Sequence, residues 1–139
     1  MRTFNRVTFP DELVLKYPLG SGKTLGIKDW ILLEPFRAFW TDDAGKEQTY
    51  TVEAGLVTDM SSIPWWAQGV PGLQKAGRNV RASIVHDDIY FRQGQPDGWT
   101  RLEADKLLYA GLRASGQGWL IASAMYRAVR LGGGEVWRT

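Results

Sequence analysis

The only histidine of the chain, His86, stands beside Asp87 in a stretch whose apolar residues recur at helical spacing. An imidazole can transfer protons near neutral pH, so His86 is the first candidate for a general base. Tyr90, four residues further on, would share its face of a helix. Adjacent helical residues do not face each other, so we expect His86 and Asp87 to border one cavity rather than to form a dyad. A structural histidine that donates to a backbone carbonyl stays open as the alternative.

Two more carboxylates can complete such a site. Asp105 lies at the edge of an apolar helix face, where a carboxylate usually needs a partner. If two helices form an antiparallel hairpin, Asp105 can orient the imidazole of His86. Asp59 follows a predicted strand and either points into the same cavity or caps its own turn. The residues expected to support the site are Thr58, Ser62, Tyr90 and Arg101.

Metal binding and serine chemistry remain alternatives for the same region. The metal candidates are His86, Asp59, Asp87 and Asp105. Their oxygen and nitrogen atoms suit a divalent cofactor such as zinc, manganese or magnesium, although no paired-histidine spacing supports one. Ser61 and Ser62 are conceivable nucleophiles, but neither lies in a Gly-x-Ser-x-Gly elbow. The chain has no cysteine, which excludes disulfides, thiolate zinc sites and cysteine nucleophiles.

Three other patterns have structural interpretations. Residues 20–24 read GSGKT, but the first glycine is misplaced for a phosphate loop, and a hairpin or surface loop is favoured. Trp65 and Trp66 are adjacent; one can close a core while the other lines a rim, where a stacking platform is the alternative. The arginines of the C-terminal third indicate a solvated helix face rather than a phosphate-binding stripe. They are Arg113, Arg127, Arg130 and Arg138.

The elements that must position these residues change type along the chain. Short apolar stretches at 12–16, 30–33, 36–40, 48–52 and 56–58 predict strands, and Gly45 suits the turn of the best hairpin. Helical periodicity covers residues 78–90, a second helix after the capping box Thr100 to Glu103, and residues 119–131. The sequence therefore predicts a single α+β domain over 1–139. Residues 1–58 are mainly β and residues 78–132 mainly α, with an N-terminal antiparallel sheet of hairpins packed against three C-terminal helices.

Composition fits an ordinary globular domain. Seventeen basic and fifteen acidic residues leave a net charge of +2, too balanced to predict a nucleic-acid partner. No apolar run is long enough for a transmembrane segment. The first residues lack the apolar core of a signal peptide, so we expect synthesis into the cytoplasm.

The second half of the chain resembles a family of small phage and prophage proteins, domain-of-unknown-function family 1353. The segments that carry the likeness are 54–59, 62–64, 81–87 with Tyr90, 101–105, 125–130, Gly132 and Trp137. Met60 and Ser61 depart from the small residues more common there. The string His-Asp-x-x-Tyr is also similar to the catalytic helix of secreted phospholipases. Those enzymes have a disulfide scaffold and a glycine-rich calcium loop, so this likeness is local.

The family resemblance implies a phage or prophage origin and supplies no established activity. Our first functional hypothesis is a virion component, in the tail or in morphogenesis, that contacts other phage structural proteins or itself. In it, His86, Asp59 and Asp105 would form a polar network that pins the sheet to the helices. The alternative is a small hydrolase of an ester or amide bond in the host envelope, with His86 as general base and Asp105 as its orienter. An inhibitor of host defence is neither supported nor excluded. We expect location in the bacterial host cytoplasm, or in the virion.

Overall fold

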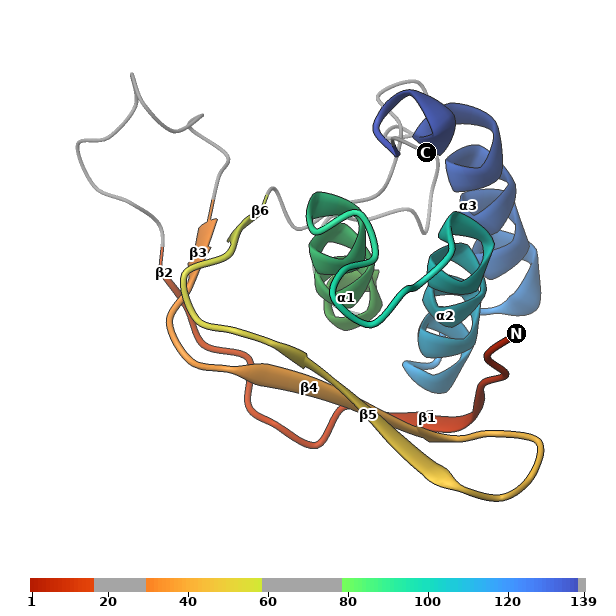
Figure 1. The fold of residues 1–139 in the computed structure, drawn as a ribbon, viewed down its shortest axis with the longest axis horizontal. Helices are drawn as coiled ribbons and strands as arrows, with labels where there is room; N and C mark the ends of the chain where they lie inside the picture. The colour runs from red at the N-terminus through yellow and green to blue at the C-terminus, as the bar shows by residue number, and fades with distance from the viewer. Residues whose placement is uncertain (17–29, 59–78, 138–139) are drawn as a thin grey trace.

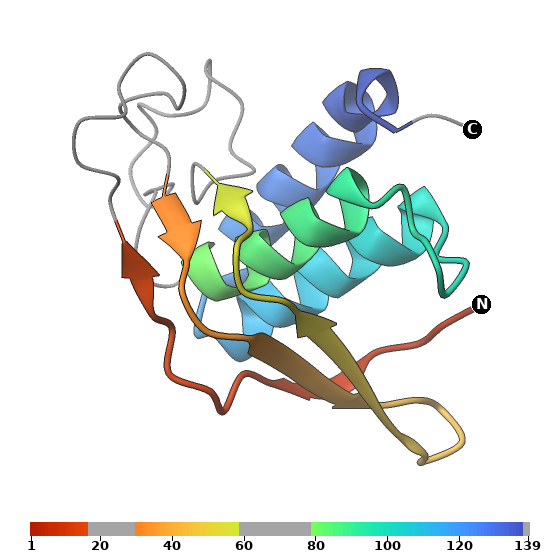
Figure 2. The same ribbon diagram turned by 60° about the vertical axis from the view of Figure 1, so that its left-hand side comes forward.

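The structure is a computed structural model and describes residues 1–16, 30–58 and 79–137. Within these ranges, antiparallel strands come first and three α-helices follow, which confirms the expected α+β fold. The helices lie side by side along one face of the strands (Figures 1 and 2).

The larger sheet is built on the hairpin that the sequence predicts. Strands β4 (Phe36–Thr41) and β5 (Glu47–Val52) pair antiparallel, with Phe36 opposite Val52. Gly45 in their turn has φ +81°, a conformation that favours glycine. Side chains alternate between buried and more exposed along β4, as a strand with one covered face requires.

Strand β1 (Asn5–Thr8) pairs with the other edge of β4 and gives the order β1-β4-β5. We did not predict this strand. Only Val7 among its four residues is buried, so no alternation of apolar residues marks it. The register shifts between Asn5 and Thr8, and Arg6 within that irregularity has φ +53°.

A second, smaller sheet has the order β2-β3-β6. Its antiparallel strands are β2 (Leu15–Lys16), β3 (Trp30–Leu32) and β6 (Val57–Thr58). All three were expected, but each is shorter than the apolar stretch that predicts it.

The helices are α1 (Val80–Phe91), α2 (Arg101–Ala114) and α3 (Trp119–Gly132), and the short 3-10 helix η3 (Gly133–Glu135) follows α3. The capping box that starts α2 is formed as predicted. The Thr100 side chain accepts from the Glu103 amide, and the Glu103 side chain accepts from the Thr100 amide. This reciprocal cap fixes where α2 begins, four residues before Asp105.

Two apolar clusters hold these layers together. One joins the inner face of β4 and β5 to α1 and α2, and includes Phe36, Val52 and Ile84, none of them measurably exposed. The other lies among the three helices and includes Leu108, Leu112 and Met125. Within the described ranges no helix is long and apolar enough to cross a membrane.

Several predictions concern residues outside the described ranges. They are those on Asp59, Ser61, Ser62, Trp65, Trp66 and the GSGKT stretch at 20–24.

Candidate functional site

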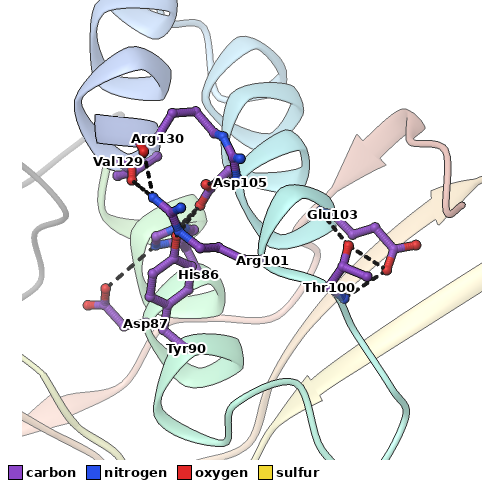
Figure 3. Close-up of polar contacts among 9 residues, drawn as sticks. All are labelled: His86, Asp87, Tyr90, Thr100, Arg101, Glu103, Asp105, Val129 and Arg130. Atoms are coloured by element: carbon purple, nitrogen blue, oxygen red, sulfur yellow. Dashed lines mark hydrogen bonds and ion pairs between the residues drawn. The ribbon is translucent and has the colours of Figure 1, made fainter. Parts of the chain in front are cut away.

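Helices α1 and α2 bring together the two residues on which the predicted site depends. His86 Nε2 on α1 lies 2.7 Å from Asp105 Oδ1 on α2, a hydrogen-bonding distance (Figure 3). The packing of α1 against α2 thus produces the contact that the helix-hairpin argument anticipated. His86 is 3% exposed and Asp105 is fully buried, so the pair is shielded from bulk water.

Asp105, on α2, is held by donors from the other two helices. The Tyr90 hydroxyl on α1 donates to Oδ1 at 2.6 Å, and Arg130 on α3 donates to Oδ2 at 2.8 Å. With His86, these contacts engage both carboxylate oxygens. We call Asp105, His86, Tyr90 and Arg130 the Asp105 network. Because its donors converge on one buried carboxylate, the orientation of the imidazole is set by the helix packing rather than by a single flexible bond.

Arg101 contacts both the Asp105 network and the end of α3. Its Nε donates to the Tyr90 hydroxyl at 3.2 Å, and its Nη2 donates to the carbonyls of Val129 and Arg130 at the C-terminal end of α3 (Figure 3). A cation at those carbonyls interacts favourably with the negative end of the helix dipole. Arg101 therefore links the Tyr90 hydroxyl to the helix that supplies Arg130.

Asp87 approaches the other nitrogen of the imidazole. Its Oδ1 lies 3.9 Å from His86 Nδ1, and its side chain is 27% exposed. The sequence argument placed these neighbours about 100° apart on the helix; the two side chains bend toward each other more than that argument anticipated. His86 thus has a carboxylate near each ring nitrogen, one fully buried and one that reaches solvent.

The electrostatics follow from this arrangement. Burial by itself lowers the pKa of His86, but the hydrogen bond to Asp105 and the charges of Asp105 and Asp87 outweigh it, so the pKa is raised above 6.5. Burial raises the pKa of Asp105, but its hydrogen bonds from His86 and Tyr90, with Arg130, hold the pKa below 3.8. Burial and the neighbouring Asp105 raise the pKa of Tyr90. Near neutral pH, Asp105 is therefore an anion and Tyr90 a neutral donor.

A second buried carboxylate lies on the sheet side of α1. Asp88 Oδ2 accepts from the Tyr50 hydroxyl on β5 at 2.5 Å and pairs with Arg92 at 3.1 Å. The contact between helices and sheet that we expected from the His86 network is made here by Asp88 and Tyr50. Within the described residues the Asp105 network joins helix to helix; the expected contribution of Asp59 to a link with the sheet lies outside the described ranges.

Arg130 is the member of the network that the sequence interpretation missed. We expected it on a solvated face, yet its side chain is one-third exposed and its guanidinium pairs with the fully buried Asp105. The only signal was Asp105 itself, since a buried carboxylate beside one histidine still has a free oxygen. Which arginine would fill that place depends on how α3 packs, and the local sequence does not contain that information.

The positions of the histidine and the carboxylates show whether the described residues could form a metal site. No group of three or more His, Cys, Asp or Glu side chains in the described ranges could hold a metal ion. Asp105 in particular has its oxygens engaged by a histidine, a hydroxyl and a guanidinium.

Comparison with known proteins identifies the family. A family model described as "Protein of unknown function (DUF1353)" matches residues 30–129, and the chain belongs to this family. The match includes the described strands β3 to β6, α1, α2 and nearly all of α3. No curated protein and no solved structure matches the chain.

Proposed function

We propose that the chain is a hydrolase of an ester or amide bond in which His86 is the general base. The observation that carries the proposal is the 2.7 Å contact from His86 Nε2 to Asp105, a carboxylate that Tyr90 and Arg130 hold in place. A histidine that acts as a general base is held in one tautomer by a carboxylate at its other ring nitrogen, and Asp105 is placed to do this.

The tautomer follows from the charge of Asp105. Because the carboxylate is an anion, it accepts the proton on Nε2, and the lone pair of neutral His86 lies on Nδ1. Nδ1 faces Asp87, whose Oδ1 is 3.9 Å away. Two acceptors at this separation can each receive one hydrogen bond of about 2.8 Å from the same water molecule. In the proposed mechanism a nucleophilic water occupies this position next to the base.

The proposed reaction uses this pair as follows. Nδ1 removes a proton from the water as its oxygen attacks the carbonyl carbon of the substrate. The resulting imidazolium is stabilised by Asp105 and Asp87, and it returns the proton to the departing alcohol or amine. Asp105, Tyr90, Arg130 and Arg101 are positioning residues, since none of them needs to touch the substrate. A contribution of Asp59 to the same cavity stays a prediction.

The chemistry of the network favours this function over a purely structural one. Burying charged groups has a large desolvation cost, and apolar side chains of similar volume often stabilise a core equally well. A histidine whose pKa is raised by two carboxylates is typical of sites that handle protons. The Asp88 contact to Tyr50 also shows that this chain can tie elements together without a histidine.

The test compares His86→Asn with Asp88→Asn. Both variants remove a buried polar group from α1, but only the first lies in the proposed site. Purified protein is assayed with p-nitrophenyl esters, phospholipid vesicles and murein, with and without divalent cations. We expect His86→Asn to lose turnover with its circular dichroism spectrum intact, and Asp88→Asn to keep it. If the wild-type chain cleaves none of these substrates, the hydrolase proposal is wrong.

A second candidate is a structural component of a phage particle. It is favoured by large apolar side chains exposed at both ends of α3, where Trp119, Leu120 and Leu131 are each more than 60% exposed. Such groups often mark surfaces that contact protein. Sedimentation velocity of the wild type against Trp119→Ser with Leu120→Ser tests it: self-association lost in the variant supports the idea, and a monomer in both removes its self-association form.

A further inference from the structure

The structure has a hollow, separate from the Asp105 network, where the N-terminal segment crosses α2 and α3. It has a volume of about 540 Å³, and its lining includes Arg2, Phe4, Lys106, Tyr109, Tyr126 and Arg127. Ligand pockets for small molecules have volumes of about 300–1,000 Å³. None of the residues of the Asp105 network lines this hollow. We call it the α2–α3 groove.

The cations of the groove outnumber the acids that could neutralise them. Arg2 is paired with Glu103, but within the described ranges Lys106 and Arg127 have no ion pair. The one acidic residue of the lining is Asp43, whose Oδ1 accepts from the Asn5 amide. Positive charge without a counter-ion at a concave surface attracts an anion.

An adjoining hollow extends the same charge. It shares Phe4, Asp43, Tyr109 and Ala110 with the groove and adds the cations Arg6 and Arg113. Its second carboxylate, Asp42, accepts from the backbone amides of Ala44 and Lys46. Arg6 has φ +53° within the irregular pairing of β1 with β4. A strained backbone persists where its surroundings impose it, and strand irregularities re-aim side chains. The irregularity of β1 thus places another cation at the rim.

Aromatic rings form the remaining wall. Tyr109 on α2 and Tyr126 on α3 pack edge to face with ring centroids 6.1 Å apart, and both are half-buried. Neither hydroxyl makes a hydrogen bond to a described residue. Rings beside cations suit a ligand that combines a flat ring with a phosphate, because the ring stacks while the phosphate pairs with Lys and Arg.

We infer that the α2–α3 groove binds a nucleoside monophosphate, with its phosphate at Lys106 and Arg127 and its base against Tyr109 and Tyr126. The volume can hold a ligand of this size, the cations without an ion pair suit its phosphate, and the tyrosine pair suits its base. The inference does not depend on the proposed hydrolase, since the groove and the Asp105 network share no residue.

Isothermal titration calorimetry tests the inference with AMP, TMP, adenosine, inorganic phosphate and the oligonucleotide (dT)8. We expect saturable binding of a monophosphate, with adenosine and phosphate each at least tenfold weaker. Binding should weaken as salt rises, because the contacts are ionic. No saturable binding of either nucleotide, or phosphate alone binding equally well, overturns the inference. An oligonucleotide that binds more than tenfold tighter than TMP also overturns it, since the ligand would then be a single strand.

Variants test the cations and the aromatic rings of the groove separately. Lys106→Gln with Arg127→Gln should weaken nucleotide binding at least tenfold, whereas Lys16→Gln, which removes an exposed cation on β2, should not change it. Tyr126→Leu should weaken binding about fivefold, while Tyr126→Phe keeps the ring and should bind normally. Circular dichroism checks that each variant is folded. Unchanged affinity in the double variant contradicts the assignment.

Discussion

Two buried carboxylates in this molecule have similar partners and different consequences. Asp88 binds a tyrosine from β5 and the arginine that caps the C-terminus of α1, and so ties α1 to the sheet. Asp105 binds a tyrosine and an arginine too, but also the only histidine. Both are hydrogen-bonded anchors. Only the second places a proton-transferring ring between the anchor and a carboxylate that reaches solvent.

The comparison shows what distinguishes a structural contact, such as that of Asp88 with Tyr50, from a candidate functional site. Tyr50 and Tyr90 both have their pKa raised by burial and by the carboxylate that they contact, so neither hydroxyl titrates near neutral pH. The difference is His86, which can gain and lose a proton there. The Asp88 contact therefore serves as an internal control for changes at Asp105, Tyr90 and His86.

The largest expected difference is between Asp105→Ala and Asp88→Ala. Removing Asp105 leaves His86, Tyr90 and the Arg130 guanidinium without their shared anion, and breaking a buried ion pair costs about 3–5 kcal/mol. Removing Asp88 leaves mainly the Tyr50 hydroxyl unpaired, at about 1–3 kcal/mol, because Arg92 reaches solvent. Urea denaturation of the two variants measures both. Equal losses in the free energy of unfolding would show that the Asp105 network is no more tightly coupled than the contact between Asp88 and Tyr50.

Asp105→Asn and Asp88→Asn separate chemistry from stability. Without the Asp105 charge, the pKa of His86 falls and its tautomer is no longer fixed. Turnover should drop by about 10²–10⁴, the range typical of general-base contributions, and the acid limb of the pH–rate profile should move to lower pH. Asp88→Asn should change neither. A profile that does not move in Asp105→Asn contradicts the orienting role.

Tyr90→Phe and Tyr50→Phe each delete one hydroxyl that donates to a carboxylate. Hydrogen bonds to charged groups contribute about 1.5–3 kcal/mol, so thermal unfolding should show similar losses. Only Tyr90→Phe should move the pH–rate profile, toward higher pH, since Asp105 then interacts more strongly with His86 and raises its pKa. A shift of the same size in Tyr50→Phe would mean that the profile reports global stability.

Gly133→Ala and Gly134→Ala test how closely η3 packs on the network. A Cβ on Gly133 would lie 2.7 Å from the Tyr90 hydroxyl oxygen, whereas at Gly134 the nearest atom is 3.5 Å away on Arg101. Overpacking at Gly133 should outweigh the smaller backbone entropy of alanine by about 1 kcal/mol. Gly134→Ala should be neutral or slightly stabilising. Equal melting temperatures would show that Tyr90 can move without cost.

The smallest effect is the pH dependence of stability. His86 has a raised pKa, so its contribution is fully present below about pH 6.5 and is lost as pH rises through its folded-state pKa. Asp105 has a lowered pKa, so its contribution is present above about pH 3.8 and is lost as pH falls through its folded-state pKa. Melting temperature against pH should therefore decline on both sides of a plateau. His86→Asn should remove the alkaline decline, and Asp88→Asn should retain it. Among the described residues, Asp87, Asp105 and Tyr90 face the imidazole.

Local patterns were enough to predict much of the fold. The alternation in β4, the glycine turn and the capping box of α2 are interactions between residues close in sequence, and each appears as expected. Strand β1 was missed because its four residues contain one buried side chain and pair with a strand some thirty residues away. In the site, too, the contacts that local patterns predict are those between neighbouring elements. Helical periodicity placed His86, Tyr90 and Asp105 near one another, since two adjacent helices offer few ways to pack.

The sequence by itself determined the inventory: one histidine, no cysteine, and a carboxylate at the edge of an apolar helix face. Tertiary structure decided which cation satisfies that carboxylate and which carboxylate ties the helices to the sheet. The physical reason is separation along the chain. Arg130 lies 25 residues from Asp105, and Asp88 lies 38 residues from Tyr50. Only the packing of whole elements brings residues so far apart in sequence into contact. A buried charge must find a partner, but the chain between the two residues does not encode which one.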